Sequence, residues 1–381
     1  MSHRNTDFHR VERNLKFFFC ENICALSVSV AVKCKIPISQ LAKSIKYLLI
    51  VTWLSACGQP TSTPLSTSAP APPPAEKSNI EETVKKPLRQ GAERTEVYLP
   101  LLKGKSVGIV ANQTSVVGNT HLVDTLLSLG IDVRSVFAPE HGFRGNASAG
   151  AKIADSKDPK TGLPIVSLYG SNYKPKPEML AGLDVVIFDI QDVGTRFYTY
   201  ISTMSYMMEA CGKNGIKMLV LDRPNPNGHY VDGLVLQQEF SSFVGLHEVP
   251  VVHGMTVGEY AKMVNDEGWL KDSIKCDLTV VKMENYAHDL EYELPIAPSP
   301  NLPNQTAIYL YPSLCFFEGT EVSEGRGTDK PFQQFGYPKM PNGNTKFTPK
   351  SIAGVAKYPK LENKKCNGVD LSGIPLDSLR N

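Results

Sequence analysis

"LDVVIFDIQD", residues 183–192, is the segment that indicates the fold class most clearly. Its centre, Val185 to Phe188, is an unbroken apolar run in which no polar residue alternates with the apolar ones. A strand of this kind is covered on both faces, which is typical of parallel sheets whose crossover connections are helices. The run ends in acidic and amide residues, so it also predicts where polar side chains gather.

Further strands and helices alternate around this stretch. Helices are predicted over 121–130 and 196–215, where apolar residues recur at helical spacing and a glycine ends each segment. The alternation predicts an α/β fold, a Rossmann-like, doubly wound and mostly parallel sheet over residues 93–240. The remaining strands of this sheet are expected at 106–112, 131–139, 163–170 and 216–228.

The chain beyond residue 240 has fewer long periodic elements. A helix opened by Thr256 is predicted over 255–268 and a strand over 277–283, followed by a Pro/Asn-rich stretch. This mixture of short predicted elements and irregular sequence predicts a second, smaller α+β domain over residues 241–381. The first turn of the large domain lacks both the G-x-G-x-x-G fingerprint and a P-loop, so nucleotide binding is not expected.

The first 57 residues have the pattern of an export signal. Lys43 and Lys46 precede an apolar run from Tyr47 to Leu54, which is too short to cross a bilayer and ends in "LSAC". The last four letters resemble the lipobox of bacterial lipoproteins, which implies a lipid anchor on Cys57 and a place in the periplasm. A short buried helix is the alternative. Residues 58–92, rich in Pro, Ser and Thr, are expected to be a disordered linker.

Charge and cysteine content exclude several functional classes. The net charge is +2, and the excess of Lys and Arg is confined to the first 46 residues, so the body is slightly acidic and nucleic-acid binding is not expected. The body has no CxxC motif or Cys/His cluster, so neither a metal nor another cofactor is expected. Its cysteines are expected to be buried thiols, with one disulfide left open; they are Cys211, Cys276, Cys315 and Cys366.

Polar residues follow each predicted strand of the sheet. Because parallel strands end at the same edge, these side chains are expected to meet in one cleft outside the carboxyl ends of the strands. Glu324 and Arg326, in the Gly-rich loop 321–332 of the smaller domain, are expected to face that cleft. The strand-end residues are Asn112, Glu140, His141, Arg144, Tyr169, Asp189, Asp192, Arg196, Asp222, Arg223 and Asn225.

Several long motifs resemble one family. "GIVANQTS", "PEHGFRG", "FDIQDVGTRFYTY", "LDRPNPNG", "HGMTVGEYA", "PSPNLPN" and "YPSLCFFEGTEVSEGRGTDKPF" occur in order and are similar to those of the exo-β-N-acetylmuramidase family of glycoside hydrolases. The resemblance implies a site between two domains, release of N-acetylmuramic acid from the non-reducing ends of peptidoglycan fragments, and Glu140 as the proton donor. Family members continue beyond "CNGVDL" with a further helical stretch, so a short C-terminal domain is expected.

A glycosidase needs a second group besides the proton donor. Asp189, Asp192 and Asp222 are the candidates, with Asp192 preferred, and the substrate's own acetamido group is an alternative. His141 is expected to support Glu140 or to bind a sugar hydroxyl. Tyr198 and Tyr200 are expected to stack on the sugar or to pack in the core of their helix, with core packing expected for one of them.

Muramic acid carries a lactyl carboxylate, which a planar guanidinium binds through two parallel hydrogen bonds. Arg196, at a predicted helix start, is the first candidate for this contact, and Arg223 and Arg326 are rivals. For Arg144 two alternatives stay open: it pairs with Glu140, or it contacts the substrate. The competing function is a lipoprotein that binds muropeptides without cleaving them.

Overall fold

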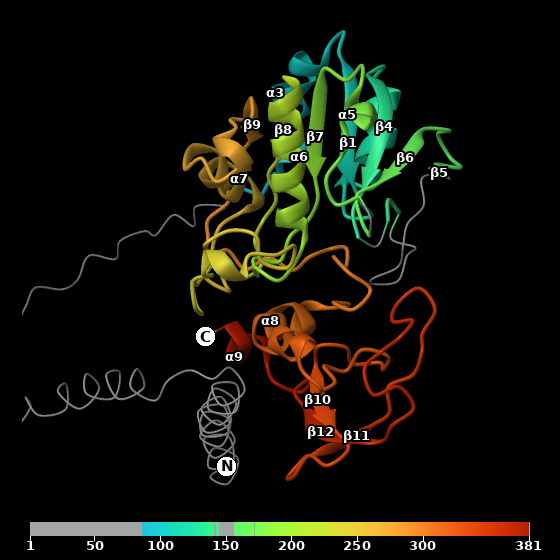
Figure 1. Cartoon of the computed structure of the whole chain (residues 1–381), viewed down its shortest axis with the longest axis vertical. Coiled ribbons are helices and arrows are strands. Elements are labelled where there is room, and N and C mark those ends of the chain that lie inside the picture. Colours follow the sequence, from blue (N-terminus) through green and yellow to red (C-terminus); the bar gives the residue numbers. More distant parts are fainter. Residues whose placement is uncertain (1–85, 141, 145–155, 171, 381) are drawn as a thin grey trace, which may run out of the picture. The chain divides into compact units, whose positions relative to one another are not determined.

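The computed structural model describes residues 86–140, 142–144, 156–170 and 172–380 (Figure 1). The predicted export signal, with Cys57, lies outside the described residues, as do most of the predicted linker and His141. The described residues belong to one compact unit. Among the described helices, none is long and apolar enough to span a membrane.

The predicted linker ends earlier than residue 92. Arg89 pairs with Glu284 as a β-bridge, and the Gly91 amide donates to the Asp222 carbonyl oxygen at 2.8 Å. A Cβ on Gly91 would lie 2.4 Å from the carbonyl oxygen of Val281, so only glycine allows this close approach. Ala92 is fully buried, which places this segment against the large sheet rather than in a free tether.

A seven-stranded sheet forms the large lobe, in the order β5-β6-β4-β1-β7-β8-β9. Neighbouring strands pair in parallel except for the short edge strand β5, which is antiparallel to β6. The predicted Rossmann-like parallel sheet is therefore confirmed. The strands are β1 (Ser106–Ala111), β4 (Asp132–Ala138), β5 (Ser156–Lys157), β6 (Pro164–Ser167), β7 (Val185–Asp189), β8 (Lys217–Leu221) and β9 (Leu278–Val281).

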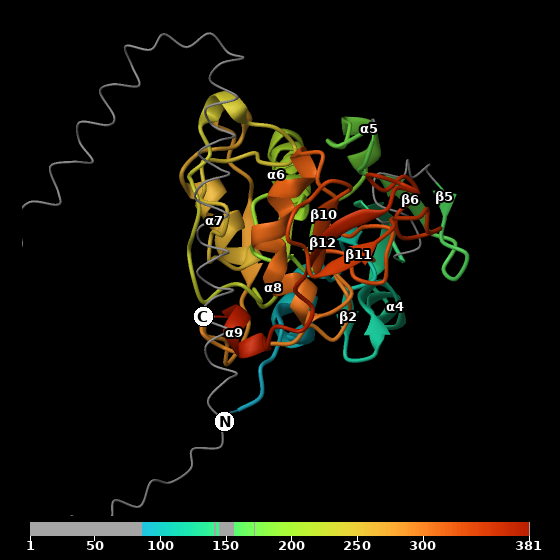
Figure 2. The same ribbon diagram turned by 90° about the horizontal axis from the view of Figure 1, so that it is seen from below.

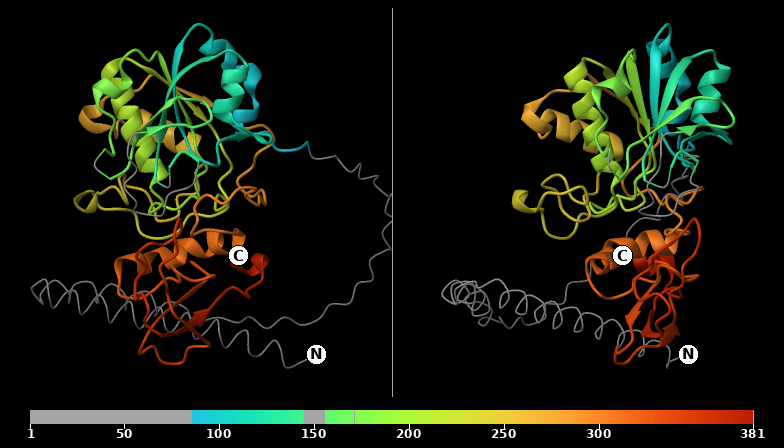
Figure 3. Two further views of the ribbon diagram at one scale, coloured as in Figure 1. Left: turned by 90° about the vertical axis from the view of Figure 1, so that its right-hand side faces the viewer. Right: turned by 45° about the vertical axis from the view of Figure 1, so that its right-hand side comes forward.

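Helices cover both faces of this sheet, as Figure 3 shows. Successive side chains of a strand point to opposite faces, so Val185 and Ile187 of β7 pack in one core while Val186 and Phe188 pack in the other. This explains why the run at the centre of β7 is apolar throughout. One core takes its helical residues from α3 (Thr95–Leu102) and α4 (Leu122–Ser128). The other includes α5 (Pro177–Leu180), α6 (Tyr200–Asn214) and α7 (Val257–Asp266) and continues into the smaller lobe.

The large lobe extends past the boundary predicted at residue 240. Strand β9 pairs in parallel with β8, and α7 packs on the same sheet, although the sequence analysis assigned both to the smaller domain. A four-residue strand gives little sign of which sheet it joins. The remaining short elements of this lobe are η1 (Gly91–Glu93), η2 (Gln238–Phe240), η3 (Lys271–Ser273) and the hairpin β2 (Val116–Val117) and β3 (Thr120–His121).

The smaller lobe lies beyond the carboxyl ends of the parallel strands (Figures 1 and 2). It combines helices with a three-stranded antiparallel sheet in the order β10-β12-β11, which confirms a smaller α+β domain. Its elements are α8 (Gln305–Leu314), η4 (Cys315–Gly319), β10 (Gln334–Tyr337), β11 (Thr345–Phe347), β12 (Cys366–Asp370) and α9 (Leu376–Arg380). The four body cysteines are buried free thiols, as expected, and form no disulfide.

Candidate active site

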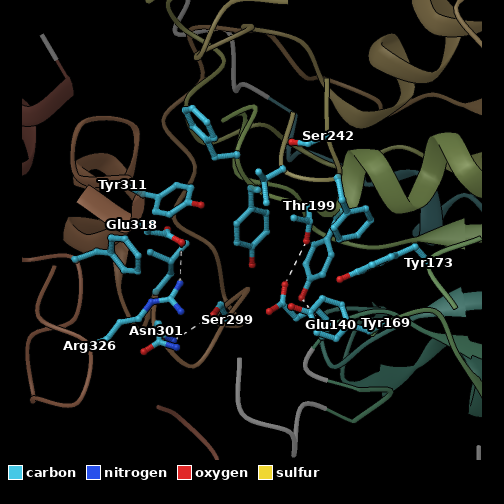
Figure 4. Close-up of a pocket in the computed structure, with 17 residues that line it drawn as sticks. Glu140, Tyr169, Tyr173, Thr199, Ser242, Ser299, Asn301, Tyr311, Glu318 and Arg326 are labelled. Carbon is cyan, nitrogen blue, oxygen red and sulfur yellow. Dashed lines mark hydrogen bonds and ion pairs between the residues drawn. The ribbon is translucent and has the colours of Figure 1, made fainter. Parts of the chain in front are cut away.

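A cavity of about 440 Å³ lies where the strand-end loops of the large lobe meet the smaller lobe (Figure 4). Eight of the 17 residues that line it are aromatic, with tyrosines from both lobes. Among the described lining residues, the Asp, Glu, Lys and Arg side chains are those of Glu140, Glu318 and Arg326. A pocket rich in aromatic side chains with a few convergent charged groups is a typical small-ligand site.

Glu140 enters this pocket from the end of β4. Thr199 Oγ1 donates a hydrogen bond to Glu140 Oε2 at 3.3 Å, and the Tyr200 hydroxyl donates to the Glu140 backbone oxygen at 3.4 Å. Burial, the charge of Glu140 and a hydrogen bond with its side chain raise the pKa of the Tyr169 phenol. The turn closes through Gly142, whose φ of 81° is the left-handed conformation that glycine tolerates best. The carboxylate is thus held from several sides.

Glu318 and Arg326 form the wall that the smaller lobe contributes. Arg326 Nη2 lies 3.3 Å from Glu318 Oε2, and Arg326 Nε lies 3.5 Å from Glu324 Oε1. Lys360 Nζ binds the other oxygen of Glu324 at 2.7 Å. Burial raises the pKa of the Glu318 carboxyl; Arg326 opposes this shift, while the charge of Glu324 adds to it.

Two family models together match most of the described body. Residues 107–306 match the model described as "Exo-beta-N-acetylmuramidase NamZ, N-terminal", and residues 309–380 match its C-terminal counterpart. The chain belongs to the NamZ exo-β-N-acetylmuramidase family. It is 43% identical over 318 residues to the Peptidoglycan beta-N-acetylmuramidase NamZ of Bacillus subtilis (strain 168), covering 78% of this chain and 75% of that protein.

Two solved structures of DUF1343 family proteins from Bacteroides fragilis NCTC 9343 share the fold. One is 51% identical with a TM-score of 0.71, covering 77% of this chain and 79% of the other. The second is 31% identical with a TM-score of 0.65, covering 76% and 78%.

In this NamZ-family chain, several predicted site residues instead bind other parts of the protein. Arg223 forms a buried bidentate pair with Asp189, with Nε to Oδ1 at 2.6 Å and Nη2 to Oδ2 at 2.9 Å. Asp222 caps the start of α7 by accepting from the Gly258 amide at 2.8 Å and the Thr256 hydroxyl at 2.9 Å. Asp222 and Arg223 therefore hold the chain in place after the end of β8. Neither is among the described residues that line the cavity.

Two more of the predicted site residues form hydrogen bonds with the backbone of long loops. Arg196 donates to the carbonyl oxygens of Leu234 and Val249. Asn225 Nδ2 donates to the Met255 carbonyl oxygen at 2.9 Å. Loops without regular structure leave carbonyl groups unpaired, and buried side-chain donors satisfy them. Arg196 and Asn225 are therefore structural in this arrangement, and the expectation that Arg196 faces the pocket is not met.

Arg144 and Asn112 also bind elsewhere. Arg144 makes two hydrogen bonds to Asp158, at 3.0 and 2.7 Å, rather than pairing with Glu140. Asn112 Oδ1 accepts from the backbone and hydroxyl of Thr114, at 2.9 and 2.6 Å, within the turn after β1. Neither is among the described lining residues of the cavity.

Asp192, the preferred second catalytic group of the sequence analysis, lies behind the pocket. Its side chain is buried, Oδ2 accepts from the Gly194 amide at 2.7 Å, and burial raises its pKa to about 7. Tyr198 does line the cavity, with its ring 4.9 Å from Tyr200 and 5.8 Å from Tyr311. Glu324 supports Arg326 and is not among the described residues of the lining.

The pocket also contains residues that were not predicted from the sequence, among them Glu318, Ser299, Asn301 and Tyr173. Glu318 lies within the motif "YPSLCFFEGTEVSEGRGTDKPF", and that motif was the signal from which it could have been found. Tyr173 follows the third strand by several residues, beyond the turn where polar residues were sought. Within the described residues, no group of three or more His, Cys, Asp or Glu side chains could hold a metal ion.

Proposed function

We propose that this protein is an exo-acting glycoside hydrolase that releases N-acetylmuramic acid from the non-reducing ends of peptidoglycan fragments during cell-wall turnover. The observation that carries the proposal is a pocket with Glu140 on one lobe and the Glu318–Arg326 pair on the other, in a chain of the NamZ family. The similar protein of Bacillus subtilis is named a peptidoglycan beta-N-acetylmuramidase.

Glu140 is the proton donor of this reaction. Water is added across the glycosidic bond: the leaving oxygen takes the proton of Glu140 as its bond to the anomeric carbon breaks, and the oxygen of water ends on that carbon. The donor must hold its proton in a fixed direction, since a misplaced acid loses most of its effect. The hydrogen bonds from Thr199 and Tyr169 supply this orientation.

Glu318 is the second carboxyl group and acts on the attacking side of the anomeric carbon. It lines the same pocket as Glu140 but comes from the other lobe. The aspartates considered in the sequence analysis have other partners: Asp189 binds Arg223 and Asp222 caps α7. Two carboxyl groups that flank one pocket are the arrangement that most glycosidases use.

Arg326 recognises the lactyl carboxylate that distinguishes muramic acid from glucosamine. Among the described residues that line the cavity, Arg326 is the one Lys or Arg. Its side chain is 27% exposed. Glu318 and Glu324 fix the guanidinium plane, and Arg326 also lies 5.1 Å from the centre of the Phe332 ring. A guanidinium that is already held in place loses little entropy when it binds the carboxylate of a ligand.

The full chain should release N-acetylmuramic acid from the disaccharide in which it is β-linked to N-acetylglucosamine. Product analysis by mass spectrometry measures this directly. Binding of the disaccharide without any product would support the competing function, a non-catalytic muropeptide-binding protein.

The "LSAC" motif supports a second part of the proposal, that Cys57 carries a lipid anchor and holds the enzyme at the cell envelope, in the periplasm. Two acyl chains suffice for stable membrane attachment. Expression with a labelled fatty acid should label the wild type and leave Cys57→Ala unlabelled. Equal labelling of both proteins would refute the anchor.

A further inference from the structure

A row of aromatic side chains adjoins Glu140 on the side of the large lobe. We call Tyr169, Tyr173 and Phe243 the aromatic wall. The Tyr169 and Tyr173 rings meet edge to face with centroids 5.6 Å apart, and the Tyr173 and Phe243 rings lie 4.1 Å apart. All three line the cavity and are half-buried, so part of each ring is open to it.

The wall touches Glu140 directly. The Tyr169 phenol hydrogen-bonds with the Glu140 carboxylate, so the first ring of the wall contacts the proposed proton donor. In Figure 4, Tyr169 and Tyr173 lie on one side of Glu140, while Glu318, Arg326 and Asn301 lie on the other. Glu140 therefore stands between two chemically different surfaces.

This asymmetry sets the direction in which the substrate lies. A proton donor must reach the oxygen that joins the two sugars, so one sugar lies on each side of it. The side with Arg326 suits the muramic sugar, which carries a carboxylate. The wall side suits a neutral sugar, because the charged lining residues other than Glu140 are on the Arg326 side and flat rings pack well against the apolar face of a pyranose.

We infer that the aromatic wall is the binding subsite for the neutral amino sugar that leaves, an N-acetylglucosamine unit β-linked to the muramic acid. The inference rests on the proposed function and adds the subsite for the leaving group. Phe243 is itself supported from behind, since Tyr206 stacks on it with centroids 6.1 Å apart and planes 16° apart. A ring that is packed against another ring keeps its position when the sugar binds, so little side-chain entropy is lost on binding.

The experiment compares two substrates that differ only in the leaving group. One is the disaccharide of N-acetylmuramic acid β-linked to N-acetylglucosamine; the other is N-acetylmuramyl β-fluoride, whose leaving group is a single atom. For Tyr173→Ala and Phe243→Ala, kcat/KM on the disaccharide should fall about tenfold or more, while on the fluoride it should change less than about twofold. Tyr173→Phe keeps the ring and should stay within about twofold on both substrates.

A matched control is Tyr358→Ala, which removes a tyrosine that is 80% exposed and outside the cavity lining. Tyr173→Leu keeps apolar volume and replaces the alanine variant if that variant unfolds. An equal loss on both substrates, or no loss on the disaccharide, would overturn the inference. Failure of the wild type to hydrolyse either substrate would instead refute the proposed function, so the two failures are distinguishable.

Discussion

Thr199 Oγ1 lies 3.3 Å from Glu140 Oε2 and donates a hydrogen bond to it, which connects the residue before α6 to the turn after β4. The two residues come from the loops after β4 and β7, the strands that lie on either side of β1 in the parallel sheet. The bond fixes the direction in which the Glu140 carboxyl points into the cavity.

Removal of this hydroxyl should slow the reaction without weakening substrate binding. Thr199→Val keeps the shape of the side chain, so kcat should fall about tenfold while KM stays within about twofold. Thr199→Ser restores the hydroxyl and should recover most of the rate. Steady-state kinetics of both variants on the disaccharide provide the measurement. A near-normal kcat in Thr199→Val, or a loss in Thr199→Ser as large as that in Thr199→Val, would contradict this role of the hydrogen bond.

Glu318 should be as necessary for turnover as Glu140. Glu318→Gln keeps the volume but cannot act as a base or nucleophile, so kcat should fall by about 100-fold or more. In Glu318→Ala, added azide can occupy the vacated space and attack the anomeric carbon, so the rate should rise with azide concentration and yield a muramyl azide. Mass spectrometry of the product checks this, and a variant that azide does not rescue would argue that the acetamido group attacks instead.

Loss of Arg326 should weaken recognition of the lactyl group. In Arg326→Ala, inhibition by N-acetylmuramic acid should weaken at least about tenfold, or about 1.4 kcal/mol, while inhibition by N-acetylglucosamine should change little. Competition assays with both sugars measure the difference. The control is Arg134→Ala, since Arg134 pairs with Asp132 on the surface and its side chain is 62% exposed. Equal weakening for both sugars would contradict a role in reading the carboxylate.

Asp192 should affect the stability of the protein, in a pH-dependent way, and not the rate of the reaction. Burial raises its pKa to about 7, well above that of an unfolded aspartate, so its contribution to stability is greatest at low pH and is lost as pH rises from about 4 to 7. Asp192→Asn has no proton to lose, so its melting temperature relative to wild type should increase by a few degrees between pH 5 and pH 8.

The same variant distinguishes the pocket from its surroundings. Because Asp192 is not among the described lining residues, Asp192→Asn should keep kcat within about threefold of wild type. Thermal melts at several pH values and kinetics at one pH suffice. A loss of kcat comparable to that of the Glu318 variants would indicate that Asp192 takes part in catalysis.

The sequence predicted the sheet well because buried parallel strands have a distinctive composition. The unbroken apolar run of β7, covered on both faces by the two cores, indicated a central strand without any knowledge of its partners. Strand β9 was assigned to the wrong lobe, because its four residues carry no signal for the sheet that they join. Membership in a sheet depends on pairing across a long loop, which local periodicity does not report.

The position of Glu140 was predictable, but most of its expected companions were not. All the strand ends meet at one edge, as the topology requires, yet Arg196 and Arg223 bind loop carbonyls and a buried aspartate instead of facing the cavity. Which polar side chains remain open depends on how the loops close over the edge, and on long-range contacts. Glu318 comes from the other lobe, after α8, and no spacing rule connects it with Glu140.

The central claim is that Glu140 delivers the proton that breaks the bond to the leaving sugar. The most direct test measures release of N-acetylmuramic acid by Glu140→Gln from two substrates, the disaccharide and a 2,4-dinitrophenyl β-muramide, whose leaving group needs no proton. We expect a loss of at least about 1,000-fold on the disaccharide, a much smaller loss on the dinitrophenyl substrate, and an unchanged melting temperature. Near-normal release from the disaccharide, or equal losses on both substrates, would contradict it.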